Sequence, residues 1–228
     1  MTRRVLAVAR CRFALVLAGA CLAIASLRAS AQETPDLFSS PATATALRAG
    51  VLATAVAEVE GSRVLEGKFT QQRTLRGLPR PLQSTGDFLL VRALGLQWHT
   101  LEPVDDEFVL TRRGIAAGDG DRRRDGRRRG PPLGAATELL FALFSLDLDT
   151  LERRFDLYGV GTVEAWQIGM RPRDKATARA VRQAVVKGGQ RVDSIALVNG
   201  AGDELLIEFR DVRVQTEEPS DEQRALFQ

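Results

Sequence analysis

Hydrophobic and polar positions alternate with a period of two along most of the chain from Val64 onward, which is typical of β-strands. The clearest stretch is Gly86–Thr100, where one parity is apolar except for a single charge at Arg92. The apolar residues of that parity are Phe88, Leu90, Leu94, Leu96 and Trp98. A strand places alternate side chains on one face, so this pattern predicts an apolar face with one arginine at its middle.

Arg92 allows two interpretations. In the first, it is an edge-strand arginine whose aliphatic stem packs while its guanidinium reaches water. In the second, the apolar face is the wall of a cavity and Arg92 is its one polar group, as in sites for small molecules or lipids. The alternation alone favours neither.

Nine strands are predicted from the same alternation, at residues 64–72, 86–92, 96–100, 108–112, 155–158, 163–171, 180–187, 192–198 and 204–214. Glycines and prolines within 75–85 predict a loop there. In the strand at 163–171, Trp166 and Ile168 share a parity and are expected to face inward. Short turns join consecutive strands, so the sheet is expected to be antiparallel. With an arginine-rich hairpin it has about eleven strands, enough to curl or close around the apolar face. The fold class is therefore mainly β (α+β).

Two helices are predicted, together with a short capped turn of helix at residues 149–154. Residues 41–60 carry an apolar stripe at spacings of four, with Thr43 or Thr45 as the cap, and Gly50 weakens this helix. Residues 133–148 are apolar on almost every side, so this helix is either a central core helix or a lid whose inner face meets an apolar ligand. The tail from Thr216 is expected to be loose.

The first 31 residues read as a signal peptide, with a basic start, an apolar run too short for a comfortable membrane span, and a cleavage site after Ala31. The alternative is a lipoprotein signal acylated at Cys21.

Removing residues 1–31 takes away five arginines and no acid, leaving 27 basic and 29 acidic residues and a net charge of −2. Both cysteines leave with this segment. We therefore expect a periplasmic protein that binds no nucleic acid, with residues 32–228 as a single domain and a monomer.

An arginine-rich hairpin is predicted at residues 118–132, because Asp125-Gly126 favours a tight turn. Its arginines are Arg122, Arg123, Arg124, Arg127, Arg128 and Arg129. The hairpin is either an ordinary solvated one or a docking surface for acidic lipid head groups or an acidic partner.

Catalytic chemistry has little support in the sequence. His99 is the only histidine, no cysteine remains after cleavage, and no His, Asp and Glu set has metal-ligand spacing. Asp105 and Asp106 form a carboxylate pair, but they lie in a predicted turn where solvation is the default. We therefore expect no metal, no cofactor and no enzymatic activity.

The segment Gly67–Gly114 resembles the LolA family, the periplasmic carriers that move lipoproteins to the outer membrane. The matching residues are Phe69-Thr70-Gln71, Gly86-Asp87-Phe88, Arg92, Trp98-His99, Pro103 and Gly114. Downstream, the order of an apolar helix and five strands is also similar. The chain looks most like a LolA-related branch, because of the arginine-rich hairpin and the run at 146–158. It has Ala93 where the family usually has proline, and its lid is unusually apolar.

This resemblance implies a half-open antiparallel β-barrel with helices as a lid over an apolar cavity that holds acyl chains. Arg92 falls on the family's arginine that tethers the lid to the barrel, so it is the expected latch. The expected lipid-binding residues are Leu65, Phe69, Phe88, Leu90, Leu96, Trp98, Leu139, Leu140, Leu143, Phe144, Trp166 and Ile168. The expected partners are an acylated lipoprotein or lipid cargo, an inner-membrane donor and an outer-membrane acceptor.

Three functions follow from these features. The first is a periplasmic carrier that shields acyl chains and delivers them toward the outer membrane. The second is a sensor or interaction module on the same fold, which binds a lipidated ligand or a partner without net transport. The third is a hydrolase, for which the residues give little reason.

Overall fold

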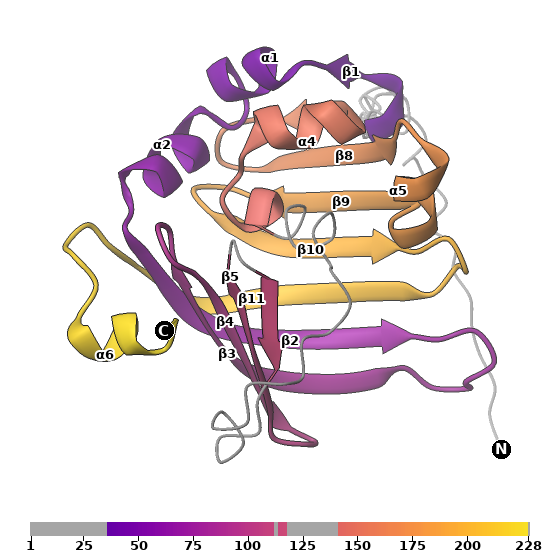
Figure 1. Ribbon diagram of the computed structural model, residues 1–228. Helices are drawn as coiled ribbons and strands as arrows, with labels where there is room; N and C mark the ends of the chain where they lie inside the picture. Colours follow the sequence, from indigo (N-terminus) through magenta and orange to yellow (C-terminus); the bar gives the residue numbers. More distant parts are fainter. Residues whose placement is uncertain (1–35, 112–113, 118–140, 228) are drawn as a thin grey trace, which may run out of the picture. The chain divides into compact units, whose positions relative to one another are not determined.

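Eleven antiparallel strands form one open, curved sheet (Figure 1). The computed structural model describes residues 36–111, 114–117 and 141–227, and for residues 114–117 it describes the backbone alone. All described residues belong to one compact unit, Pro35–Gln228. The strands are β1 (Pro41–Ala42), β2 (Val64–Thr74), β3 (Leu82–Val91), β4 (Gly95–Glu102), β5 (Asp106–Thr111), β6 (Gly114–Ala117), β7 (Phe155–Gly161), β8 (Trp166–Pro172), β9 (Gln183–Gly188), β10 (Val192–Val198) and β11 (Glu204–Gln215).

The sheet consists of two runs of consecutive strands that meet at its centre. Its order is β1-β7-β8-β9-β10-β11-β2-β3-β4-β5-β6. The long pairing of β11 with β2, from Glu204↔Thr74 to Gln215↔Val64, joins the two runs. Every other neighbouring pair except β1 with β7 is joined by a short connection, as the alternating pattern predicted. The predicted fold class, a mainly β half-open antiparallel sheet of about eleven strands, is confirmed.

Apolar side chains on the inner face of the sheet form the main core. Three helices pack on that face: α1 (Ala44–Ala49), α2 (Ala53–Gly61) and α4 (Leu148–Arg154), which lie together in Figure 1. Each buries apolar residues there, such as Leu47 of α1, Val56 of α2 and Leu151 of α4. Among the described residues, no helix is long and apolar enough to cross a membrane.

A smaller apolar cluster lies on the outer face. Val64, Leu89 and Val91 are buried there, and Leu226 and Phe227 pack against them from the C-terminal segment. The short helix α6 (Asp221–Ala225) precedes these two residues and begins with a capping box formed by Ser220 and Gln223. The prediction of a loose tail is therefore wrong, because the tail forms a capped helix and two half-buried apolar residues at its end pack against the sheet.

Several element boundaries differ from those predicted. The helix predicted at 41–60 is two helices, because the chain breaks at Gly50, whereas the Thr43 side chain caps α1 as expected. Strand β3 begins at Leu82, inside the predicted loop at 75–85. A short helix, α5 (Lys175–Ala180), was missed; Asp174 caps it by accepting from two backbone N–H groups.

The strand count of eleven is reached differently from the prediction. Two short edge strands, β1 and β6, supply the additional strands. The arginine-rich hairpin that was counted in their place lies outside the described residues, together with the first half of the helix predicted at 133–148. Of that helix, residues 141–144 are helical, and the chain then turns at Leu146, whose φ is 48°. Leu148 already belongs to α4, so the predicted helix end at residue 148 is too late.

Candidate functional site

The residues predicted to contact an apolar ligand gather in the main core. Those described and fully buried are between 1% and 8% exposed and belong to one contiguous cluster. They are Leu65, Phe69, Phe88, Leu90, Leu96, Trp98, Leu143, Trp166 and Ile168. Phe144 is half-buried and packs against the same cluster. Leu139 and Leu140 lie outside the described residues.

Six aromatic rings meet at one end of this core and are named the aromatic cluster: Phe69, Phe88, Trp98, Phe108, Phe144 and Phe209. The tightest pair is Phe69 with Trp98, whose ring centroids are 3.8 Å apart and stacked. Trp98 also contacts Phe144 at 5.8 Å, edge to face. Such geometries add roughly 0.5–1.5 kcal/mol per pair beyond the area buried.

Five strands place five of these rings on the inner face. Cross-strand pairing sets Phe88 opposite Trp98, Trp98 opposite Phe108, and Phe69 opposite Phe209. Phe108 and Phe209 were not among the predicted lipid-binding residues, although each falls on the inward-facing parity of its own strand. Only the register of β5 and β11 shows that they continue the row of rings that begins at Phe69.

Phe144 is the one ring of the aromatic cluster that does not come from the sheet. It belongs to the helical residues 141–144, and its ring contacts those of Phe88, Trp98 and Phe209 at centroid distances of 5.6–6.3 Å. These contacts are apolar and non-directional. Burial of apolar surface therefore holds these helical residues against the sheet here.

The interior offers almost no polar chemistry. Among the described residues, Ser62 is the only buried polar side chain, and its hydroxyl donates to the carbonyl oxygen of Val59 at 2.7 Å. In the same part of the chain, no group of three His, Cys, Asp or Glu residues is placed to hold a metal ion. His99 lies on the outer face of β4, where it meets Asp105 at 2.7 Å. The core is suited to apolar ligands that need no directional partner.

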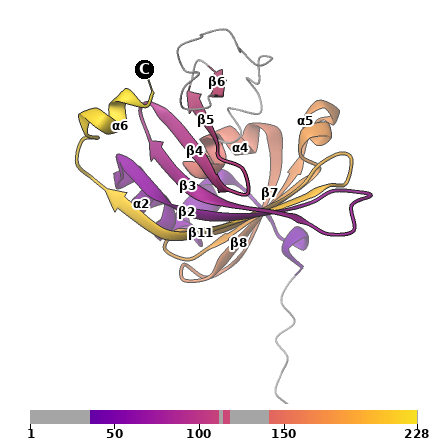
Figure 2. The ribbon, with the colours of Figure 1, turned by 90° about the horizontal axis from the view of Figure 1, so that it is seen from below.

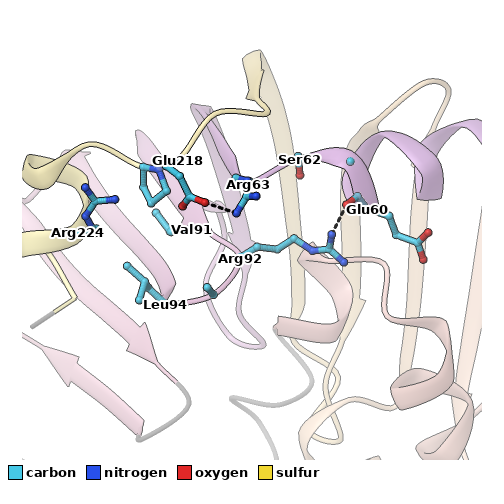
Figure 3. Close-up of a pocket in the computed structure, with 11 residues that line it drawn as sticks. Glu60, Ser62, Arg63, Val91, Arg92, Leu94, Glu218 and Arg224 are labelled. Carbon is cyan, nitrogen blue, oxygen red and sulfur yellow. Dashed lines mark hydrogen bonds and ion pairs between the residues drawn. The ribbon is translucent and has the colours of Figure 1, made fainter.

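Arg92 does not lie where either interpretation of the sequence placed it. It sits in the turn between β3 and β4, exposed to solvent, and is not part of the apolar wall. Its Nη1 donates to the carbonyl oxygen of Glu60, near the end of α2, at 2.5 Å (Figure 3). Leu94, predicted on the same inner parity, packs with the outer-face cluster. The prediction that Arg92 lies in the middle of the apolar face is wrong, because the turn at 92–94 interrupts the alternation.

A second arginine, missed in the sequence, holds α2 from the other side. Arg191 follows β9, and its Nε donates to the carboxylate of Glu58 in α2 at 2.7 Å. Its Nη1 donates to the carbonyl oxygen of Val212 at 2.8 Å, where the register of β11 shifts. Arg92 thus attaches α2 to the β3–β4 turn, and Arg191 attaches it to the β9–β10 turn.

A groove of about 430 Å³ lies beside the Arg92 attachment (Figure 3). The end of α2, the β3–β4 turn and the C-terminal segment line it. Arg63 forms an ion pair with Glu218 across this groove at 2.5 Å. The groove is a surface feature at the rim and is separate from the aromatic cluster.

Arg191→Met is expected to lower the free energy of unfolding by about 1–2 kcal/mol, since it removes a half-exposed ion pair and a charged hydrogen bond. Arg92→Leu is expected to cost about 0.5–1 kcal/mol, the usual worth of a cation at a helix C-terminus. Both variants should raise hydrogen exchange in α2. Arg213→Met is the control, because its pair with Glu66 is 3.9 Å long and largely exposed. Equal exchange in α2 for all three variants would contradict this attachment.

The open antiparallel sheet, its apolar inner face and the helices across it define a binding fold built around an apolar interior. The chain belongs to the family described as outer membrane lipoprotein carrier protein LolA-like, whose model matches residues 42–204.

Solved structures of similar fold include the MucA/MucB complex of Pseudomonas aeruginosa, at 14% identity and a TM-score of 0.41, covering 75% of this chain and 58% of that one. Another is the LolA superfamily protein NE2245 from Nitrosomonas europaea, at 7% identity and a TM-score of 0.40, covering 78% and 97%. A second MucB structure, in complex with MucA(peri), is covered over 57% of its length. The chain thus spans less than three fifths of the MucB chains. No curated protein sequence matches it.

Proposed function

We propose that this protein is a periplasmic carrier that holds the acyl chains of a lipoprotein or another lipid against its inner face and delivers them toward the outer membrane. The observation that carries this proposal is the aromatic cluster. Five of its rings belong to the sheet, and the sixth, Phe144, belongs to the helical residues 141–144 and contacts three of those rings. In this proposal the segment moves outward, and the acyl chain lies between Phe144 and the rings of the sheet.

The energetics of such binding need no catalytic or charged group. Each methylene buried from water stabilises a complex by roughly 0.8 kcal/mol, so one long acyl chain supplies useful affinity. Side chains fill the interior, so a ligand can enter only when the helical segment moves. The free energy needed for that movement lowers the net affinity, and the cargo can therefore leave again. Family membership supports acyl chains as the ligand, since the family is described by its likeness to a lipoprotein carrier.

Location and partners complete the proposal. In it, residues 1–31 direct export and are removed after Ala31, and residues 32–228 act in the periplasm. The carrier is proposed to act as a monomer. An inner-membrane donor loads the protein and an outer-membrane acceptor unloads it. Arg92 acts as a latch on α2 from the solvent side, together with Arg191, because both bonds break when α2 lifts.

Phe144→Ser is expected to weaken binding of a fluorescent fatty acyl probe by about tenfold, roughly 1.4 kcal/mol, because the bound chain loses an apolar wall. Phe144→Leu keeps an apolar side chain and should bind within about twofold of the unaltered protein. The matched control is Phe38→Ser: Phe38 is also half-buried, but it lies beside Tyr158 and Arg171, outside the core.

Transfer of a labelled lipid from donor to acceptor vesicles tests carriage as distinct from binding. A carrier accelerates transfer in proportion to its concentration, and Phe144→Ser should abolish most of the acceleration. Tight binding of the probe with no acceleration would overturn the carrier and favour a sensor or interaction module on the same fold. Equal binding by Phe144→Ser and Phe38→Ser would show that the aromatic cluster is only structural core.

A further inference from the structure

Exposed apolar side chains concentrate at a hairpin tip that the binding interior does not use. Leu78 lies in the connection between β2 and β3, and Leu82 is the first residue of β3; their side chains are 47% and 51% exposed. Only two other large apolar side chains are comparably exposed in the described part of the chain, Leu101 and Val104 near the next hairpin turn. Large exposed leucines at the end of a protruding hairpin indicate a surface that binds a partner.

The tip stands clear of its neighbours. Strand β11 pairs with β2 only as far as Thr74, and β4 pairs with β3 only from Thr85. Residues 75–84 therefore extend beyond the strands on both sides, and Figure 2 shows the hairpin projecting away from β4 and β5. Gly77, with a φ of 88°, allows the chain to turn at this point.

The charge of this tip is strongly one-sided. Residues 73–82, named the basic tip, contain Arg73, Arg76 and Arg80 and no acidic residue. All three arginines are exposed. Among the described residues Arg80 has neither an ion-pair nor a hydrogen-bond partner, so its charge is free for an anionic surface. Pro79 and Pro81 flank it and carry no backbone N–H that would lose water on contact.

The base of the tip is fixed. The backbone N–H of Arg76 donates to the carboxylate of Asp203 at 3.1 Å, and the Asn199 amide donates to the same group. These bonds, the first above all, lower the pKa of Asp203, so the carboxylate stays ionised near neutral pH. An anchored base presents the leucines and arginines in one arrangement, which reduces the entropy lost on docking.

We propose that the basic tip is a membrane-docking element, in which Leu78 and Leu82 enter the interface of a bilayer while Arg80 and its neighbours meet anionic phospholipid head groups. Leucines surrounded by arginines are the composition of segments that bind anionic bilayer interfaces. The shape favours a bilayer over a protein partner, because recognition of peptides uses grooves or strand edges and this feature is a convex tip. The inference does not depend on acyl chains binding in the interior.

Vesicle flotation tests the proposal with the processed protein purified from the periplasm. We expect binding to vesicles that contain phosphatidylglycerol in phosphatidylcholine, weaker binding to pure phosphatidylcholine, and release as salt is raised. Arg80→Glu changes the charge by two units, so it should reduce binding by more than the roughly fivefold effect of one charge at an anionic surface. Leu78→Ser with Leu82→Ser should reduce it to a similar degree.

The matched control is Leu101→Ser with Val104→Ser. These side chains are 45% and 67% exposed but lie among Glu102, Asp105 and Asp106, so their loss should leave vesicle binding unchanged. Equal binding by the tip variants and the unaltered protein would overturn the proposal, as would binding only to an acidic protein and to no vesicle. Acyl-probe binding in solution should stay unchanged in the tip variants, which separates this inference from the proposed carrier function.

Discussion

Trp98→Ala is expected to lower the free energy of unfolding by about 3–5 kcal/mol, the largest loss among single truncations in the aromatic cluster. Trp98 is 5% exposed and contacts Phe69, Phe88, Phe108, Phe144 and Phe209. Its removal leaves a cavity at the point where five strands and the helical segment meet. Urea denaturation followed by circular dichroism measures the loss, since the secondary structure reports unfolding without the Trp98 fluorescence.

Phe38→Ala is the control for this truncation, because the Phe38 ring lies outside the core and should cost less than about 1.5 kcal/mol. A double-mutant cycle with Phe69→Ala and Trp98→Ala should give a coupling of about 0.5–1.5 kcal/mol for the stacked pair. A loss for Trp98→Ala no larger than that for Phe38→Ala would contradict the assignment of the aromatic cluster as the centre of the core.

Gly86→Ala is expected to destabilise the fold by about 3 kcal/mol or more, at the upper end of the usual cost of overpacking. A Cβ at this position would lie 1.9 Å from the carbonyl oxygen of His99 and 2.8 Å from the Phe69 ring. The first of these atoms is backbone in the paired strand β4, so relief of the clash requires β3 and β4 to separate locally.

Gly61→Ala is the counterpart of that substitution. A Cβ at Gly61, the last residue of α2, meets nothing within 4 Å. The change should be neutral or stabilising by up to about 1 kcal/mol, since alanine is the better helix former. Thermal unfolding of both variants checks the pair, and a Gly86→Ala variant as stable as Gly61→Ala would contradict the β3–β4 register.

The strand pattern was predictable because one face of the central part of the sheet is buried. Alternation in 86–91 and 95–102 placed Phe88, Leu90, Leu96 and Trp98 together, and they are indeed buried in one cluster. The strands at 180–187, 192–198 and 204–214 were also predicted, because glycine-containing turns separate them. Edge strand β1 has only two residues, too few for any period to be recognised.

Features that depend on register or on distant partners were not predictable. Arg92 continues the parity of Phe88 and Leu90 in the sequence, but a turn needs no particular parity, so the alternation gave a false inner position. Arg191 has no local pattern at all; its role exists only because α2 brings Glu58 to it. Leu226 and Phe227 likewise become half-buried only because they pack against the outer face of β3.

Native mass spectrometry of the protein purified gently from the periplasm tests the central claim most directly. The account predicts a population whose mass exceeds that of residues 32–228 by one acylated lipid, and a much smaller bound fraction for Phe144→Ser than for Phe38→Ser. Protein recovered entirely without lipid, and unable to take up an added acyl chain, would contradict the claim that the apolar interior is a lipid-binding site.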